Sequence, residues 1–249
     1  MDEIVRHRAF MRSNFAALRR TLTDQARGLP QPPLQLPHDP RAEVLPLPPA
    51  DRAVIRKNDL YACLQERRSR RQFSDHPLSK AELSFLLWAT QGVQEIIKDG
   101  YATLRPVPSA GARHPFETYL LVSRVEGLEP GLYRYLPLSH QLLLRRRDRE
   151  LDPALVRAAC DQGFLAEAAV VFFWSCVPYR GEWRYHLAAH KVMLLDAGHL
   201  CQNLYLACEA LDCATCAVAA YDQERMDELL GLDGQDEYVV YLAPVGRRR

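Results

Sequence analysis

Four arginines and one serine follow one another at Arg67-Arg68-Ser69-Arg70-Arg71, where a predicted helix ends. Guanidinium groups bind phosphate through forked, charge-assisted hydrogen bonds, and a hydroxyl can add another. The same composition is typical of a basic helix end in solvent, where cations also complement the helix dipole. The segment alone therefore leaves a phosphate site and a solvated helix end both open.

A second segment, Pro108–Pro115 with the sequence PSAGARHP, combines small residues with a hydroxyl. Ala110, Gly111 and Ala112 are small enough for the backbone to lie flat against an aromatic ring, and Ser109 supplies the hydroxyl. Proline, serine and glycine are equally typical of a plain turn between two elements. This segment predicts either such a turn or a surface for a planar ligand.

The order of these segments resembles the FMN-binding nitroreductase superfamily. The resemblance covers roughly residues 56–249 and also rests on 212–222 and on the closing PVGR at 244–247. It implies that flavin phosphate and ribityl are held by Arg67, Arg68, Ser69 and Arg71. It further implies that the isoalloxazine ring lies along Pro108, Ser109, Ala110 and Gly111, often those of a partner subunit.

The same resemblance assigns roles near the C-terminus. It implies that Arg247 and Arg249 approach the phosphate, and that a backbone amide of Ala219 or Ala220 meets flavin N5. Family glycines are replaced here at three positions, by Asp212, Ala214 and Ala220. An alanine at a position that needs a positive φ would be strained. Without the resemblance, these residues predict only a helix end, a core strand and a basic tail that frays.

Residues 179–204 resemble the SagB-type dehydrogenase branch, whose members oxidise azoline rings in modified peptides. Residues 194–204 match that branch's helix signature L-L-D-A-G-H-x-x-Q-N-L. A Lys-Tyr pair is implicated there in removing a Cα proton, and Arg184-Tyr185 lies at about that place. Arginine does not readily become a neutral base, so Tyr185 is the expected acid/base, helped by the charge of Arg184. His199 and Asn203, one helical turn apart, either face the site together or are structural.

Helices and strands are predicted to carry these residues. Asp59 can cap a helix that turns Leu60, Cys63 and Leu64 toward the core and ends at the arginines. Ser79 and Glu82 form a capping box, and Gly92 is a candidate C′ glycine. Further helices are predicted at 80–91, 188–211 and from Asp222 to Gly231, the second apolar on most faces and central or shared between subunits. Strands are predicted at 117–125, 131–136, 140–147, 169–177 and 238–245.

Strands and helices are interleaved with hairpins and long loops, which favours an α+β fold. The resemblance implies a central, mostly antiparallel sheet wrapped by helices, in a homodimer. Residues 1–27 predict an arginine-rich amphipathic helix, and 28–49 a proline-rich extended connector on the surface. The chain is therefore divided into an N-terminal arm, 1–50, and an FMN-binding domain, 51–249.

Composition narrows the function. The formal charge of +1 over 249 residues argues against broad binding to nucleic acid or an anionic membrane, and no apolar run is long enough to span a bilayer. The chain starts without a secretory signal and has seven scattered cysteines, which favours reduced thiols in the cytoplasm. Cys213 and Cys216 have redox or zinc half-site spacing, but no second pair is present, so no metal site is expected. No Rossmann, P-loop or HExxH motif occurs.

These observations predict an FMN-dependent oxidoreductase, with three versions left open. One is a SagB-type dehydrogenase that passes hydride from a small-molecule or peptide-derived, azoline-like substrate to flavin N5. The second is an NAD(P)H-dependent nitro or quinone reductase. The third is a weakly active or inactive partner protein of a biosynthetic complex.

Overall fold

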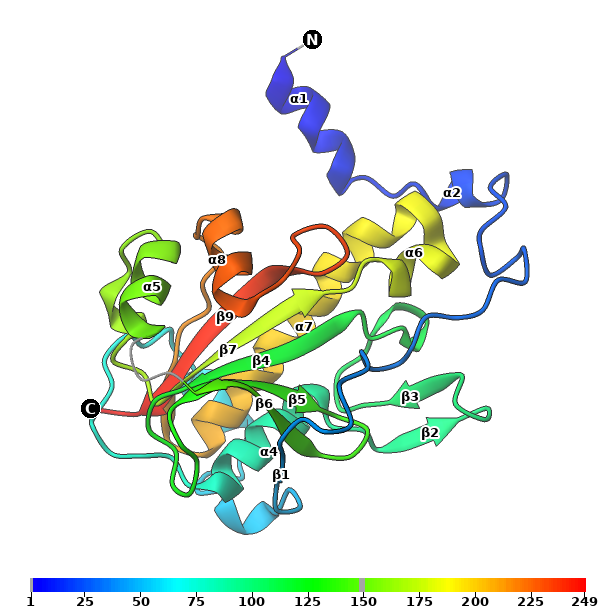
Figure 1. Ribbon diagram of the computed structural model, residues 1–249. Coiled ribbons are helices and arrows are strands. Elements are labelled where there is room, and N and C mark those ends of the chain that lie inside the picture. Colours follow the sequence, from blue (N-terminus) through cyan, green and yellow to red (C-terminus); the bar gives the residue numbers. More distant parts are fainter. Residues whose placement is uncertain (1, 148–150) are drawn as a thin grey trace.

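A seven-stranded sheet lies at the centre of the computed structural model, which describes residues 2–147 and 151–249 (Figure 1). Its strand order is β1-β6-β5-β4-β7-β9-β8, and every strand pair is antiparallel. The predicted antiparallel α+β architecture is therefore confirmed. The strands are β1 Val44–Pro46, β4 Phe116–Val122, β5 Gly131–Leu136, β6 Gln141–Arg147, β7 Val170–Cys176, β8 Cys213–Thr215 and β9 Tyr238–Arg247, and a separate hairpin pairs β2 Glu95–Ile97 with β3 Ala102–Leu104.

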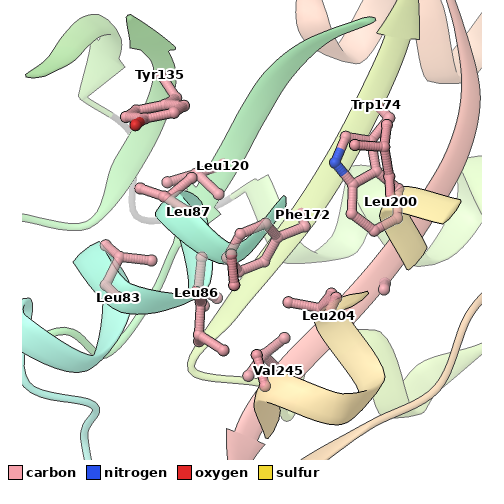
Figure 2. Packing of buried hydrophobic residues seen from close by; sticks show 14 of the residues in the cluster. Leu83, Leu86, Leu87, Leu120, Tyr135, Phe172, Trp174, Leu200, Leu204 and Val245 are labelled. Atoms are coloured by element: carbon pink, nitrogen blue, oxygen red, sulfur yellow. The ribbon is translucent and has the colours of Figure 1, made fainter. Parts of the chain in front are cut away.

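Helices cover both faces of this sheet. Alternate residues of a strand point to opposite faces, so Leu120 and Phe172 lie on one side and Tyr119 and Phe173 on the other. Helices α4 (Lys80–Gln91) and α7 (Ala189–Ala210) pack on the first face, and α5 (Leu151–Ala158) and α8 (Gln223–Leu230) on the second. Figure 2 shows the first core, where leucines of α4 and α7 surround the strand residues. Both faces of β4 and β7 are thus buried.

The predicted helix ends are mostly confirmed. The Ser79 and Glu82 capping box starts α4, and Asp222 caps α8 before Gly231 ends it with a left-handed φ of 70°. The C′ role predicted for Gly92 is wrong, because its φ is −57°. Glycine is needed there for space, since a Cβ would lie only 2.7 Å from the Trp88 Cα.

Helix α3 (Leu60–Glu66) starts at Asp59 as predicted, with the Ala62 N–H donating to the Asp59 carboxylate. The orientation predicted for its leucines is wrong. Leu60 is 64% exposed and Leu64 53% exposed, and Cys63 is the buried residue of this helix. The helix is only seven residues long and rests on α7 with one side.

The single helix predicted over residues 1–27 is also wrong. The arm contains short helices α1 (Glu3–His7), η1 (Arg8–Met11) and α2 (Phe15–Leu18), and α1 projects from the body in Figure 1. Short helices need a packed face to be stable, and these three bury no residue. The connector is mostly extended, but its β1 pairs with β6 and so joins the sheet.

Buried charges of the body hold the middle of the arm. Arg180 and Glu117 form an ion pair with both side chains 2% exposed. The Arg180 Nε–H donates to the Pro33 carbonyl at 2.9 Å, and Glu117 accepts from the Leu36 N–H at 3.0 Å. Because a buried ion pair must satisfy its remaining hydrogen bonds, the arm backbone stabilises this one.

The remaining short helices are η2 Arg52–Val54, η3 Ala110–Ala112, η4 Gly163–Leu165, α6 Tyr179–Tyr185 and η5 His186–Ala188. None of the helices in the described part of the chain is long and apolar enough to cross a membrane.

Candidate functional site

The arginine segment leaves α3 and runs beside β8, where the Arg70 N–H donates to the Thr215 carbonyl at 2.9 Å. Two of its side chains meet Tyr205 of α7. The Arg67 guanidinium lies over the Tyr205 ring, 5.3 Å from its centroid, and Ser69 Oγ lies 2.9 Å from the Tyr205 hydroxyl. Arg67 and Ser69 therefore lie together around a tyrosine that none of the motifs contains, and their contact with a flavin phosphate stays a prediction.

The arginines of this segment have different partners. Arg70 binds the buried carboxylate of Glu209 at 2.9 Å, and Lys57 and Arg248 bind the same carboxylate. Burial alone would raise the pKa of Glu209, but these cations outweigh it and the pKa is lowered. Arg70 is thus neutralised by the fold.

The other three arginines are not neutralised. Arg67 and Arg71 lie over aromatic rings, and Arg68 donates to the carbonyls of Gln65 and of Arg67 itself. Among the described residues, no carboxylate lies within 4.0 Å of any of these three guanidiniums. Their positive charge is therefore available to an anion.

Two predicted phosphate contacts lie at the end of β9 and beyond it. The Arg247 guanidinium pairs with Glu82 and donates to the Leu211 carbonyl at 3.3 Å. Burial raises the pKa of Glu82, but hydrogen bonds from Ser79 and Arg247 outweigh it and lower the pKa. Arg249 is exposed. Arg247 thus ties β9 to the start of α4, and the phosphate role of both arginines stays a prediction.

Asp196 of α7 organises the small-residue segment. Its carboxylate accepts from Ser109 Oγ at 2.6 Å and from the Ala110 N–H at 3.1 Å, while Ser109 Oγ accepts from the His114 N–H at 2.9 Å. Burial raises the pKa of Asp196 even though these bonds lower it. Pro108 is exposed beside this network. Asp196 begins the DAGH part of the helix signature, yet its partner could not be read from the sequence.

Gly111 faces the predicted acid/base pair of α6. It has a φ of 60°, and a Cβ there would lie inside 3.0 Å of the Tyr185 hydroxyl and 3.0 Å from Arg184 Nε. The Arg184 guanidinium lies 5.5 Å from the Tyr185 ring centroid and donates to the Tyr101 hydroxyl at 2.7 Å. The fold therefore brings Tyr185 and Arg184 against Gly111 of the small-residue segment Pro108–Pro115, which we call the strip. Tyr101 is a contact that the sequence did not indicate.

His199 and Asn203 do not face one site together. Asn203 donates to the Ala89 carbonyl of α4 at 2.9 Å, which is a packing role. The His199 side chain is 48% exposed, with Nδ1 3.9 Å from Asp196 Oδ1. A different histidine, His114, belongs to the small-residue segment itself, and burial lowers its pKa to about 3.

The residues that replace family glycines lie between α7 and α8. Asp212 has a φ of 59°, a conformation that aspartate tolerates better than most residues. Ala214 and Ala220 do not have a positive φ, so the strain considered for them is absent. Ala219 and Ala220 are exposed, and Gln162 donates to the Ala220 carbonyl at 2.8 Å. Their backbone contact with a flavin stays a prediction.

The CxxC pair has no metal partner and no disulfide. All seven cysteines are free, and burial raises the pKa of Cys213 to about 12. No group of metal-binding side chains occurs among the described residues. Cys213 and Cys216 are both buried and pack in the core.

The two groups of candidate residues lie on opposite sides of α7. Asp196 holds the small-residue strip, and Tyr205 holds the arginine segment. These two residues are nine positions apart, which is about 2.5 helical turns, so their side chains leave the helix in opposite directions. One chain therefore presents the arginine segment and the small-residue segment on two different sides of α7.

This arrangement can be compared with known proteins. The sequence pattern of the nitroreductase family matches residues 64–247. The chain belongs to the nitroreductase family. Members of this family are oxidoreductases that typically use flavin.

Two relatives support the assignment at different distances. A protein of Methanocaldococcus jannaschii described as a nitroreductase, MJ1384, is 36% identical over 194 residues, which are 78% of this chain and 93% of that one. The trifolitoxin-processing protein TfxB of Rhizobium leguminosarum bv. trifolii is 29% identical over 143 residues. That match spans 52% of this chain and 36% of TfxB.

Solved structures show the same fold. A protein from Anabaena variabilis, described as a nitroreductase, has a TM-score of 0.71 at 28% identity over 84% of this chain and 42% of its own. A second from Ralstonia eutropha has a TM-score of 0.68 at 26% identity over 89% and 99% of the two chains. A chain of the Escherichia coli microcin synthetase McbBCD complex, solved with truncated pro-MccB17, has a TM-score of 0.61 at 19% identity over 75% and 72%. This last similarity shows the fold alone.

Proposed function

We propose that this protein is an FMN-dependent oxidoreductase. The proposal rests on two features that occur in the same chain. Arg67 and Ser69 form a cluster that could bind an anion and that has no carboxylate partner among the described residues. The strip at Gly111, beside Tyr185, could lie against a flat ring. The cluster offers hydrogen-bond donors, and no carboxylate lies within 4.0 Å of the Arg67 guanidinium among the described residues, which suits a phosphate. The strip has only small side chains, or none, at Ala110, Gly111 and Ala112, which suits a flat ring. The residues present therefore fit FMN.

The two parts of the proposed site come from two subunits. Since Asp196 and Tyr205 point to opposite sides of α7, the strip of one chain would complete the phosphate cluster of another. Exposed apolar residues on α3 and α7 support a homodimer: Leu60, Tyr61, Leu64, Leu194 and Leu195 are all 47% exposed or more. An apolar surface of this kind is typical of a subunit interface.

FMN, when bound, supplies a hydride acceptor at N5. Tyr185 is the group that takes a proton from the substrate carbon, and loss of that proton together with the hydride leaves a new double bond. Arg184 is held by Tyr101 and lies over the Tyr185 ring. Arg184 thus helps to orient Tyr185. His199, whose side chain is 48% exposed, provides a proton exit beside Asp196.

The substrate we propose is a peptide-derived azoline or a similar ring, as in SagB-type dehydrogenases. The relationship to TfxB, a toxin-processing protein, and the fold shared with a microcin synthetase chain support this choice. Both names also suggest a partner protein in a biosynthetic complex. The seven free cysteines fit a reducing compartment such as the cytoplasm.

Two alternatives differ in the source of electrons. An NAD(P)H-dependent nitro or quinone reductase would use the same flavin site, and the relative described as a nitroreductase favours it. A weakly active partner protein would keep the fold with little chemistry. Retention of both the arginine cluster and the strip argues against that version.

The test is the absorbance spectrum of the purified protein, with the released chromophore identified. We expect about one FMN per chain, and Arg67→Ala or Ser69→Ala to lower that content. Bleaching by NAD(P)H would favour the reductase, whereas bleaching only by an azoline peptide would favour the dehydrogenase. A colourless protein that takes up no added FMN would refute the proposal.

A further inference from the structure

The hydroxyl of Tyr205 joins three segments that are distant in sequence. The Ala217 N–H donates to its oxygen at 2.8 Å, and Ser69 Oγ lies 2.9 Å from the same oxygen. The ring lies beneath the Arg67 guanidinium. Tyr205 therefore contacts both of the predicted phosphate ligands that the fold brings together.

The hydrogen bonds at Tyr205 allow Ser69 to act as a donor toward a ligand. The backbone N–H of Ala217 is always a donor, so the Tyr205 oxygen accepts from it. Either hydroxyl can donate in the contact between Tyr205 and Ser69, and when Tyr205 donates, Ser69 keeps its own proton for another group. A serine that donates, beside a guanidinium that only donates, is arranged for an anion.

We propose that Tyr205 is a positioning residue for the anion site of Arg67 and Ser69, and that it acts by orienting the Ser69 hydroxyl toward the FMN phosphate. The proposal rests on the proposed function. The ring also limits the conformations of Arg67 before the phosphate arrives, which lowers the entropy cost of binding. Tyr205 itself does not touch the phosphate.

The experiment measures the dissociation constant of FMN, by quenching of flavin fluorescence, for full-length protein from which the cofactor has been removed. Tyr205→Phe removes the hydroxyl and keeps the ring under Arg67. Tyr133→Phe is the matched control, because it also removes a hydrogen-bonded tyrosine hydroxyl, which donates to the Glu129 carbonyl at 2.7 Å, and lies on β5, which carries none of the proposed site residues. Ser69→Ala and the double variant Ser69→Ala/Tyr205→Phe complete a cycle.

We expect Tyr205→Phe to weaken FMN binding about fivefold to tenfold, and Ser69→Ala by about tenfold or more. The double variant should bind no more weakly than Ser69→Ala, since Tyr205 acts through Ser69. Urea unfolding of each variant without cofactor separates binding from stability. This pattern is not produced by a merely structural tyrosine.

Three outcomes overturn the inference. If Ser69→Ala weakens binding while Tyr205→Phe binds FMN as tightly as Tyr133→Phe, the FMN site stands and the role of Tyr205 is wrong. If Tyr205→Phe weakens FMN binding equally in the unmodified protein and in the Ser69→Ala variant, the tyrosine only supports Ala217. If neither Ser69→Ala nor Arg67→Ala changes the affinity, the proposed phosphate site itself is refuted.

Discussion

Gly111→Ala tests whether the small-residue strip is seated against Tyr185. The backbone there has a φ of 60°, and a left-handed conformation costs an alanine about 1–2 kcal/mol. The added Cβ would also lie inside 3.0 Å of the Tyr185 hydroxyl. Overpacking of this kind costs about 1–3 kcal/mol, so we expect Gly111→Ala to lower the free energy of unfolding by about 2–5 kcal/mol in total.

Two other variants separate these contributions. Gly231→Ala has a similar φ of 70° with nothing within 4 Å of its Cβ, so it should show the backbone cost alone. In a Tyr185→Phe background the hydroxyl is missing, and the cost of Gly111→Ala should fall toward that of Gly231→Ala. The free energy of unfolding is measured in urea for each variant without cofactor.

FMN content of the same variants connects the packing to the proposed site. A strip that lifts away from Tyr185 should also hold the flavin ring less well, so Gly111→Ala should be purified with less FMN than Gly231→Ala. The reasoning is refuted if Gly111→Ala is no less stable than Gly231→Ala, or if removal of the Tyr185 hydroxyl restores nothing.

Three more expectations follow from other contacts. Tyr185→Phe should keep its flavin and turn over the true substrate at least about 100-fold more slowly, and an unchanged rate would make Tyr185 structural. Deletion of residues 1–49 should lower the free energy of unfolding by at least about 3 kcal/mol, because Arg180 and Glu117 lose backbone partners worth about 1.5–3 kcal/mol each. Deletion of residues 1–18 keeps these partners and is the control. Equal urea midpoints for the two truncated proteins would contradict this expectation. Burial lowers the pKa of His114 to about 3 from 6.5, so its contribution to stability is complete above pH 6.5 and is lost toward pH 3, at about 1.4 kcal/mol per pH unit. The His114→Gln variant should lose less stability than the unmodified protein between pH 6.5 and pH 3. If the free energies of unfolding of the two proteins change with pH in parallel, this role of His114 is excluded.

Signals that act over a few residues were sufficient for much of the fold. The capping box of Ser79 and Glu82, and the Asp222 cap with Gly231, predict helix ends because donor and acceptor are only three residues apart or because the backbone itself needs glycine. The buried strand at 169–177 was recognisable as a continuous apolar run. Each of these predictions depends on local chemistry and is confirmed.

Features that depend on distant partners were missed. Leu60 and Leu64 have the apolar spacing of a core helix, but the side of α3 that rests on α7 is decided by tertiary packing. The strand at Val44–Pro46 is too short and too rich in proline to be predicted, and it forms because β6 offers an edge. Tyr205 gave no signal because its partners lie on other elements.

The arginine segment shows why site residues could be predicted only as a group. In an extended chain, successive side chains point to opposite sides, so Arg67 and Ser69 face Tyr205 while Arg70 faces Glu209. Glu209 lies 139 residues beyond Arg70, and nothing within the segment marks which arginine it will bind. An anion that approached Arg70 would compete with a buried carboxylate already shared with two other cations. No such carboxylate competes for Arg67 or Ser69, and this difference is the reason why we propose these two positions for the phosphate.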